Sequence, residues 1–173
     1  IASNIKPIFG ADVWIENSVN SEQPHKILLL CQNHQGFTNL SELLSKAYLE
    51  NQVRGRPVIK KSWVLKSHHG LIALSGSLHG CIGTLLDQNK VTEAREELIL
   101  WKESFGDRFY LEIQRYGDEF FRKRENQYIE RVCFLAAENK VPLVATHPIQ
   151  FMRTDDFRAC LLYTSDAADD GLS

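Results

Sequence analysis

Strand-like and helix-like segments alternate along this chain, and the alternation restricts the possible fold more than any other feature of the sequence. Segments that read as strands lie at 6–15, 25–31, 71–74, 108–114 and 141–146. Longer segments that read as helices lie at 36–48, 91–105 and 118–139. This order predicts an α/β fold of packed layers or a barrel, and it disfavours an all-helical or an all-β chain.

Two neighbouring segments show the pattern clearly. The run His25–Cys31 is apolar enough for a strand buried on both faces, so we predict an interior strand with parallel neighbours. The helix that follows opens at 36–39 and is broken at 55–57. Its apolar residues recur at spacings of three and four and predict one stripe packed on the sheet. They are Leu40, Leu43, Leu44, Ala47 and Tyr48.

Length and composition allow the chain to form one hydrophobic core. With 173 residues, 43% of them hydrophobic, it forms one domain or part of one. We expect a fragment, because the chain opens at Ile1 without a basic leader or a long apolar run. We also expect a cytoplasmic protein without membrane contacts, since no run approaches the roughly 18 to 20 apolar residues of a membrane span. Residues 160–173, small and acidic, are expected to be an unstructured tail that is not native sequence.

The net charge argues against a strong DNA-binding surface, and the spacing of the cysteines argues against a disulfide or metal framework. The net charge is −2 and the pI about 6.3, so no global positive field draws this segment to DNA. The cysteines lie far apart without a CxxC pair, which predicts reduced core thiols rather than disulfides or a metal knuckle. They are Cys31, Cys81, Cys133 and Cys160.

Few residues carry a recognisable catalytic pattern. The glycine-rich segment 75–80 lacks the lysine of a phosphate-binding loop and reads as a tight strand-to-helix turn. The six histidines form no HxH or HExxH motif, and His68 with His69 reads as a solvated turn. Asp12 and His147 are the best single candidates because both lie near strand ends, although a structural hydrogen-bonding role is the more common one there.

Charged residues elsewhere read as surface. Glu112 and Arg115 could form an acid and a basic partner, but outward alternation along their strand explains their placement equally well. The clusters Lys60–Lys61 and 122–124 read as solvated faces.

Five blocks in order resemble the polymerase and histidinol phosphatase (PHP) domain of bacterial replicative DNA polymerases. The blocks are 5–12, 25–48, 70–76, 108–115 and 141–146. The resemblance implies a distorted (β/α)7 barrel in which residues 1–159 are about the later two-thirds of the domain. The barrel is then incomplete because its first strands are missing, and we expect the isolated segment to be unstable.

The resemblance also implies where metal ligands would lie. Metal-binding relatives begin with an HxH motif upstream, carry an acidic residue at the position of Asp12, and often carry Cys at the position of Ser77. They also often carry Asp and His at the positions of Pro148 and Gln150. Serine, proline and an amide are poor ligands for Zn²⁺ or Mn²⁺. We therefore expect no catalytic or cofactor-binding residue in this segment, with Asp12 as a vestigial metal ligand.

The function implied by the resemblance is that of a catalytically silent scaffold in a DNA-directed DNA polymerase. The implied partners are the proofreading exonuclease subunit and other replicase subunits, with DNA contacts and the Mg²⁺-dependent nucleotidyl transfer in other domains. One alternative is a metal-dependent PHP phosphoesterase acting on a phosphate ester, which predicts Asp and His shortly after Ala145–Thr146. A second is an α/β binding domain of unrelated origin.

Overall fold

The computed structural model describes residues 5–115 and 119–149, and five of the described strands form one mixed sheet. Its order is β1-β2-β5-β6-β7. The strands are β1 (Gly10–Ile15), β2 (His25–Cys31), β5 (Leu71–Leu74), β6 (Phe109–Gln114) and β7 (Leu143–Thr146). β2 runs antiparallel to β1 and to β5, whereas β5, β6 and β7 run parallel to one another.

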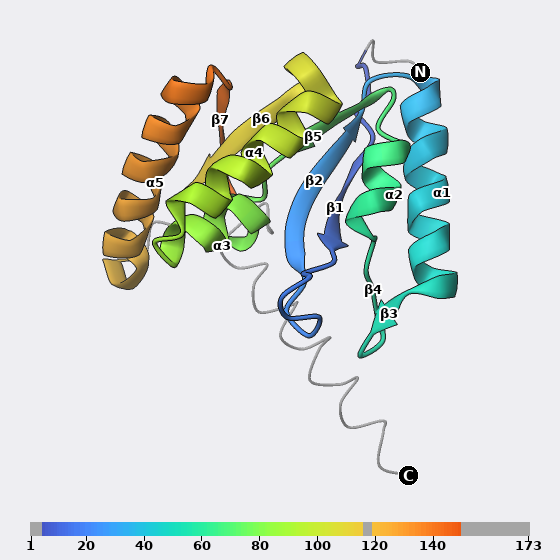
Figure 1. Cartoon of the computed structure of the whole chain (residues 1–173). Helices are drawn as coiled ribbons and strands as arrows, with labels where there is room; N and C mark the ends of the chain where they lie inside the picture. Colours follow the sequence, from blue (N-terminus) through green and yellow to red (C-terminus); the bar gives the residue numbers. More distant parts are fainter. Residues whose placement is uncertain (1–4, 116–118, 150–173) are drawn as a thin grey trace, which may run out of the picture.

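Helices flank this sheet along its length. They are α1 (His34–Glu50), α2 (Lys61–Lys66), α3 (Cys81–Asp87), α4 (Val91–Phe105) and α5 (Glu119–Asn139). Two 3-10 turns, η1 (Ser77–His79) and η2 (Gly106–Arg108), and a small hairpin of β3 (Gln52–Val53) and β4 (Arg56–Pro57) complete the described chain. Figure 1 shows α1 and α2 on the side of β1 and β2, and α5 beside β7 at the opposite end.

The core lies between the sheet and the helices. Leu40, Leu43 and Ala47 of α1 are buried, as the helical spacing predicts. From α4, the ring of Trp101 stacks on Phe109 of β6 with centroids 5.9 Å apart. Aromatic stacking of this kind adds to the apolar burial that holds helix and sheet together. The predicted α/β class is therefore confirmed.

Several element predictions are confirmed and others are wrong. Helix α4 spans the predicted residues, and β2 is interior, but β2 is antiparallel to both neighbours, so the predicted parallel orientation is wrong. An apolar run reports burial, while strand direction depends on the neighbours. The first strand begins at Gly10 rather than at residue 6. Tyr48 is 58% exposed, so it does not belong to the buried stripe of α1.

Some predictions lie outside the described residues. Asp118, the expected start of the last helix, Gln150 and the proposed tail 160–173 are among them. Within the described part of the chain, no helix is both long enough and apolar enough to cross a membrane.

Candidate functional site

A cleft of about 360 Å³ opens where β5, β6 and β7 end. The amino end of β2 reaches the same place, because β2 runs antiparallel to β5. Carboxyl ends of parallel strands are where α/β folds place their ligand sites. The cleft is lined by Asp12, Trp14, Lys26, Leu28, Gly76, His79, Glu112, Gln114, Thr146, His147, Pro148 and Ile149.

The turn after β5 shapes one wall of the cleft. Gly76 has a φ of +77°, and a Cβ there would lie 2.2 Å from the carbonyl oxygen of Lys26. Only glycine fits this left-handed conformation and this close approach. The chain then enters η1, so the tight strand-to-helix turn predicted for 75–80 is confirmed.

Glu112 is the best-anchored carboxylate of the cleft. Its side chain is buried, with 3% of the residue exposed. One carboxylate oxygen accepts the backbone N–H of Gly76 at 3.0 Å. The other accepts the Thr146 hydroxyl and, at 3.0 Å, the Gln114 amide. Glu112 thus joins β5, β6 and β7, and the reading of this residue as outward surface is wrong.

The backbone of Glu112 is fixed as firmly as its side chain. Its N–H donates to the Ser75 hydroxyl at 2.9 Å, and its carbonyl accepts the Tyr128 hydroxyl at 2.7 Å. Burial raises the pKa of Tyr128, so the phenol stays protonated and can donate. Helix α5 is thereby tied to the floor of the cleft.

Asp12, the other candidate acid, faces a cation from the same chain. The Lys26 ammonium lies 3.4 Å from an Asp12 carboxylate oxygen, with side chains 37% and 62% exposed. His79 lies in the same cleft, and burial, followed by the positive charges of Lys26 and Arg124, lowers its pKa. The cleft therefore carries its own positive charge beside Asp12.

The structure brings together some of the residues singled out from the sequence. Asp12, His147 and Pro148 line one cleft, although they come from opposite ends of the chain. Ser77 is 1% exposed and lies in η1 beside the cleft, while Gln150 is not described. In the ranges 5–115 and 119–149, no three His, Cys, Asp or Glu side chains are placed to hold a metal ion.

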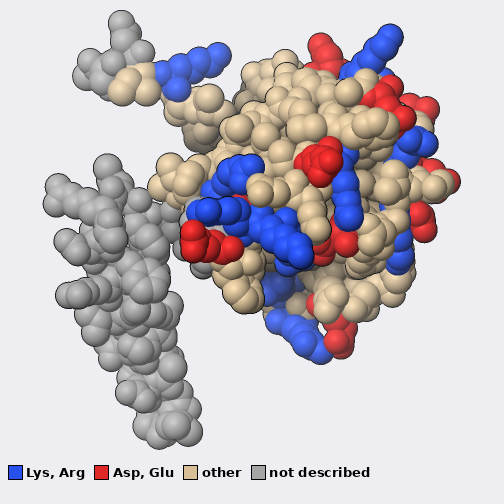
Figure 2. All heavy atoms as spheres, turned by 90° about the vertical axis from the view of Figure 1, so that its left-hand side faces the viewer, with Lys and Arg blue, Asp and Glu red and all other residues tan. Residues whose placement is uncertain are grey.

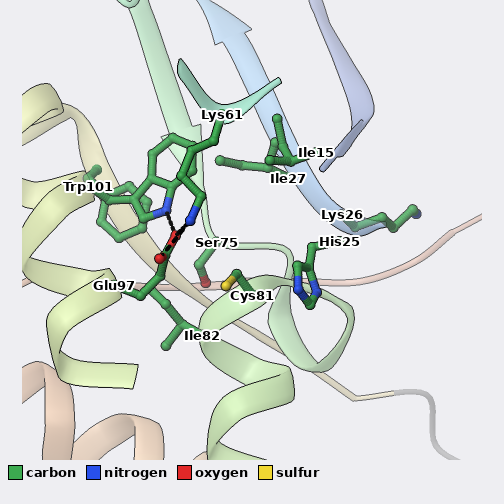
Figure 3. A pocket seen from close by; sticks show the side chains of 11 residues that line it. Ile15, His25, Lys26, Ile27, Lys61, Ser75, Cys81, Ile82, Glu97 and Trp101 are labelled. Carbon is green, nitrogen blue, oxygen red and sulfur yellow. Dashed lines mark hydrogen bonds and ion pairs between the residues drawn. The ribbon is translucent and has the colours of Figure 1, made fainter. Parts of the chain in front are cut away.

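A second polar cluster is partly buried and brings together Lys61 of α2, Cys81 of α3 and Glu97 of α4 (Figure 3). Glu97 accepts from the Lys61 ammonium at 2.8 Å and from the Trp101 indole at 2.7 Å. Burial, together with the nearby Glu97 carboxylate, raises the pKa of Cys81 to about 12. The adjoining space of about 10 Å³ holds no more than about one water molecule. The cluster is a structural ion pair, and the prediction that Lys61 belongs to a solvated face is wrong.

Of the remaining predictions for cysteine, histidine and basic residues, some are confirmed and others are wrong. Cys31, Cys81 and Cys133 are free thiols as predicted, but each is half-buried, so their assignment to the core is wrong. Cys160 is outside the described residues. His68 is half-buried and takes part in a 3.2 Å hydrogen bond with Arg108, so its reading as a solvated residue is wrong. The basic residues 122–124 are exposed, as predicted.

The mixed α/β fold is compatible with the result of a comparison against family models. The model of the PHP domain matches residues 1–116. Because this match covers more than half of the 173 residues, the chain belongs to the PHP domain family.

Individual relatives share one name. The chain is 35% identical over 159 residues to the DNA polymerase III subunit alpha of Pseudomonas aeruginosa, covering 92% of the chain. It is 34% identical over 155 residues to that of Vibrio cholerae and 32% over 157 residues to that of Escherichia coli K12, covering 90% and 91% of the chain. The chain spans about 13% of the length of each of these relatives.

Proposed function

We propose that this chain is part of the PHP domain of a DNA polymerase III alpha subunit, the DNA-directed DNA polymerase of chromosome replication, and that the segment is a catalytically silent scaffold. Residues 1–159 form the later part of a (β/α)7 barrel, and the tail 160–173 does not belong to the domain. The likeness in name and sequence to alpha subunits supports the assignment to a replicase component.

The proposal of a catalytically silent scaffold rests on one observation: both carboxylates of the cleft already interact with groups of the chain itself. Both oxygens of Glu112 accept hydrogen bonds from Gly76, Gln114 and Thr146. Asp12 pairs with Lys26. A divalent metal needs several free anionic or imidazole ligands, and an ammonium group at the same place repels it.

The residues present therefore do not fit the metal cluster of PHP phosphoesterases. Pro148 offers no side-chain ligand, and Ser77 offers a neutral hydroxyl in place of a thiolate. No step of a phosphoester hydrolysis is assigned to this segment. The Mg²⁺-dependent nucleotidyl transfer and the contacts with DNA belong to other domains of the parent polymerase, which works in the cytoplasm.

The proposed role of the scaffold is to bind partner proteins. We propose that the domain docks the proofreading exonuclease subunit and contributes to contacts with other replicase subunits. A rigid sheet whose strand ends are joined by Glu112 suits this role, because binding surfaces lose less entropy on association when they are already ordered.

The test is a metal and activity measurement on the complete alpha subunit, purified without chelators. We expect no stoichiometric zinc or manganese by mass spectrometry, and no hydrolysis of p-nitrophenyl phosphate when Mn²⁺ or Zn²⁺ is added. Stoichiometric tightly bound metal together with metal-dependent hydrolysis would establish the phosphoesterase alternative and overturn the silent scaffold.

A further inference from the structure

A second hollow, of about 410 Å³, lies next to the cleft and shares Trp14 and His79 with it. Its walls come from the loop 16–24 between β1 and β2, from η1, from α3 with the residues that follow it, and from α5. Asp12 and Pro148 line the cleft and not this hollow, which we call the loop pocket. Its volume falls within the roughly 300 to 1,000 Å³ of small-molecule sites.

His25, the first residue of β2, lines the loop pocket, and its ring has no hydrogen-bond partner among the described residues. The residue is 9% exposed. Figure 3 shows the ring apart from the ion pair of Lys61 and Glu97, with no dashed line reaching it. Burial lowers the pKa of His25, so the ring is neutral near pH 7 and offers one N–H donor and one acceptor. Because buried polar groups nearly always have a partner, this ring favours a ligand in the pocket.

Positive charge predominates at the loop pocket. Of the described residues that line it, Lys90 and Arg124 are basic and none is Asp or Glu. Asp87 fixes Arg124, whose Nε and Nη2 donate to the carboxylate at 3.1 and 2.8 Å and whose Nη1 remains available. Lys90 is exposed and pairs with no described carboxylate, so its ammonium gives the pocket an excess positive charge. Figure 2, which looks onto the α5 side of the molecule, shows Lys and Arg gathered in a band on this face. The pocket therefore favours an anion.

The uncharged walls of the loop pocket suit a flat ring with polar atoms at its edge. Trp14 and Leu85 supply apolar surface. Gln88 lines the pocket, and its side-chain amide forms no hydrogen bond with a described residue, so the amide can bind the edge of a ligand. The Asn17 amide donates to the Gln23 carbonyl at 2.9 Å and orders the loop. The pocket is thus largely preformed, as small-molecule sites usually are.

We propose that the loop pocket binds a nucleoside phosphate. The phosphate lies at the Lys90 ammonium and the Nη1 of Arg124, where its hydrogen bonds are charge-assisted. The base lies along Trp14, and the His25 ring and the Gln88 amide bind its polar edge. A nucleoside phosphate combines an anion, a flat ring and edge donors and acceptors, whereas inorganic phosphate has the anion alone. The proposal goes beyond the docking role, does not depend on it, and assigns no reaction to the pocket.

The test is titration calorimetry on the complete alpha subunit, without Mg²⁺ or primer–template, using deoxyadenosine monophosphate, deoxyadenosine and inorganic phosphate. We expect the nucleotide to bind more tightly than either of its parts. Lys90→Glu reverses the charge at the phosphate and should weaken nucleotide binding by about tenfold. His25→Phe keeps a ring and removes its nitrogens, and should weaken binding by about fivefold. The matched control is Lys66→Glu, which makes the same charge change at an exposed position of α2 outside the pocket.

The variants decide whether the nucleotide binds at the loop pocket or elsewhere in the subunit. Weaker binding in Lys90→Glu and His25→Phe, with unchanged melting temperatures and an unchanged Lys66→Glu, supports the proposal. Equal affinity of wild type and Lys90→Glu places the nucleotide at another site and overturns the proposal, as does the absence of nucleotide binding. Inorganic phosphate that binds as tightly as the nucleotide overturns the assignment to a nucleoside. The scaffold function is decided separately, by the metal and activity measurement described above.

Discussion

Glu112 shows what sequence reasoning could and could not find at single residues. Alternation along its strand put it on the opposite face from Phe109 and Leu111, which is correct, but that face borders the cleft and not open solvent. Gln114, two residues on, shares the face, and this polar pair was the available signal. The donors Gly76, in the turn after β5, and Thr146, at the end of β7, are distant in sequence, so the sequence does not place them beside the carboxylate.

Replacing Glu112 should destabilise the protein. In Glu112→Ala the half-buried Gly76 N–H and the Thr146 hydroxyl lose this acceptor, at about 1–3 kcal/mol for each group left unsatisfied. We expect the free energy of unfolding, measured with urea and tryptophan fluorescence, to fall by about 3 kcal/mol. Glu130→Ala is the control, since it removes an exposed carboxylate from α5 and should change stability by less than about 0.5 kcal/mol. Equal stability of the two variants contradicts the role given to Glu112.

At the scale of elements, length decided what could be predicted. The long helices α1 and α4 and the apolar strands β2 and β5 carry enough periodic residues to stand out. The short helices α2 and α3, of six and seven residues, were not predicted because so few turns give no clear period. The direction of β2 was predicted wrongly, since it depends on pairing with β1 and β5.

The first turn of α1 is fixed by contact with the loop before β5. A Cβ added at Gly36 would lie 1.9 Å from the carbonyl oxygen of Gly70, and Gly70 itself has a φ of +72°. In an exposed helix interior, Gly→Ala stabilises by about 1 kcal/mol. Here the overlap with backbone dominates, and Gly36→Ala should destabilise by about 2 kcal/mol in urea unfolding.

Ser45→Ala is the matched control for this substitution. Ser45 is exposed on the same helix, so alanine there should be neutral or stabilise by a few tenths of a kcal/mol. If Gly36→Ala is as stable as Ser45→Ala, the close packing of α1 on the Gly70 loop is wrong.

At the scale of the whole molecule, the sheet brings the two ends of the described chain to one cleft. Asp12 lies in β1 and His147 directly follows β7, and both line the cleft. The sequence placed both near strand ends, which fits an α/β fold, but their meeting depends on the order of five strands. The Lys26 ammonium beside Asp12 was also beyond prediction, because its position follows from the antiparallel pairing of β1 with β2.

This arrangement predicts that Asp12 is dispensable. The pair of Asp12 and Lys26 is largely exposed, and such pairs contribute about 0–1 kcal/mol. Asp12→Asn in the complete alpha subunit should therefore leave melting temperature, metal content, primer-extension rate and exonuclease affinity close to wild type. Lys26→Met, which removes the cation instead, serves as the paired variant and should behave alike. If Asp12→Asn lowers the amount of bound metal or a phosphoesterase activity while Lys26→Met does not, Asp12 is a working metal ligand. Such a difference would mean that the Asp12 carboxylate does more than balance the charge of Lys26.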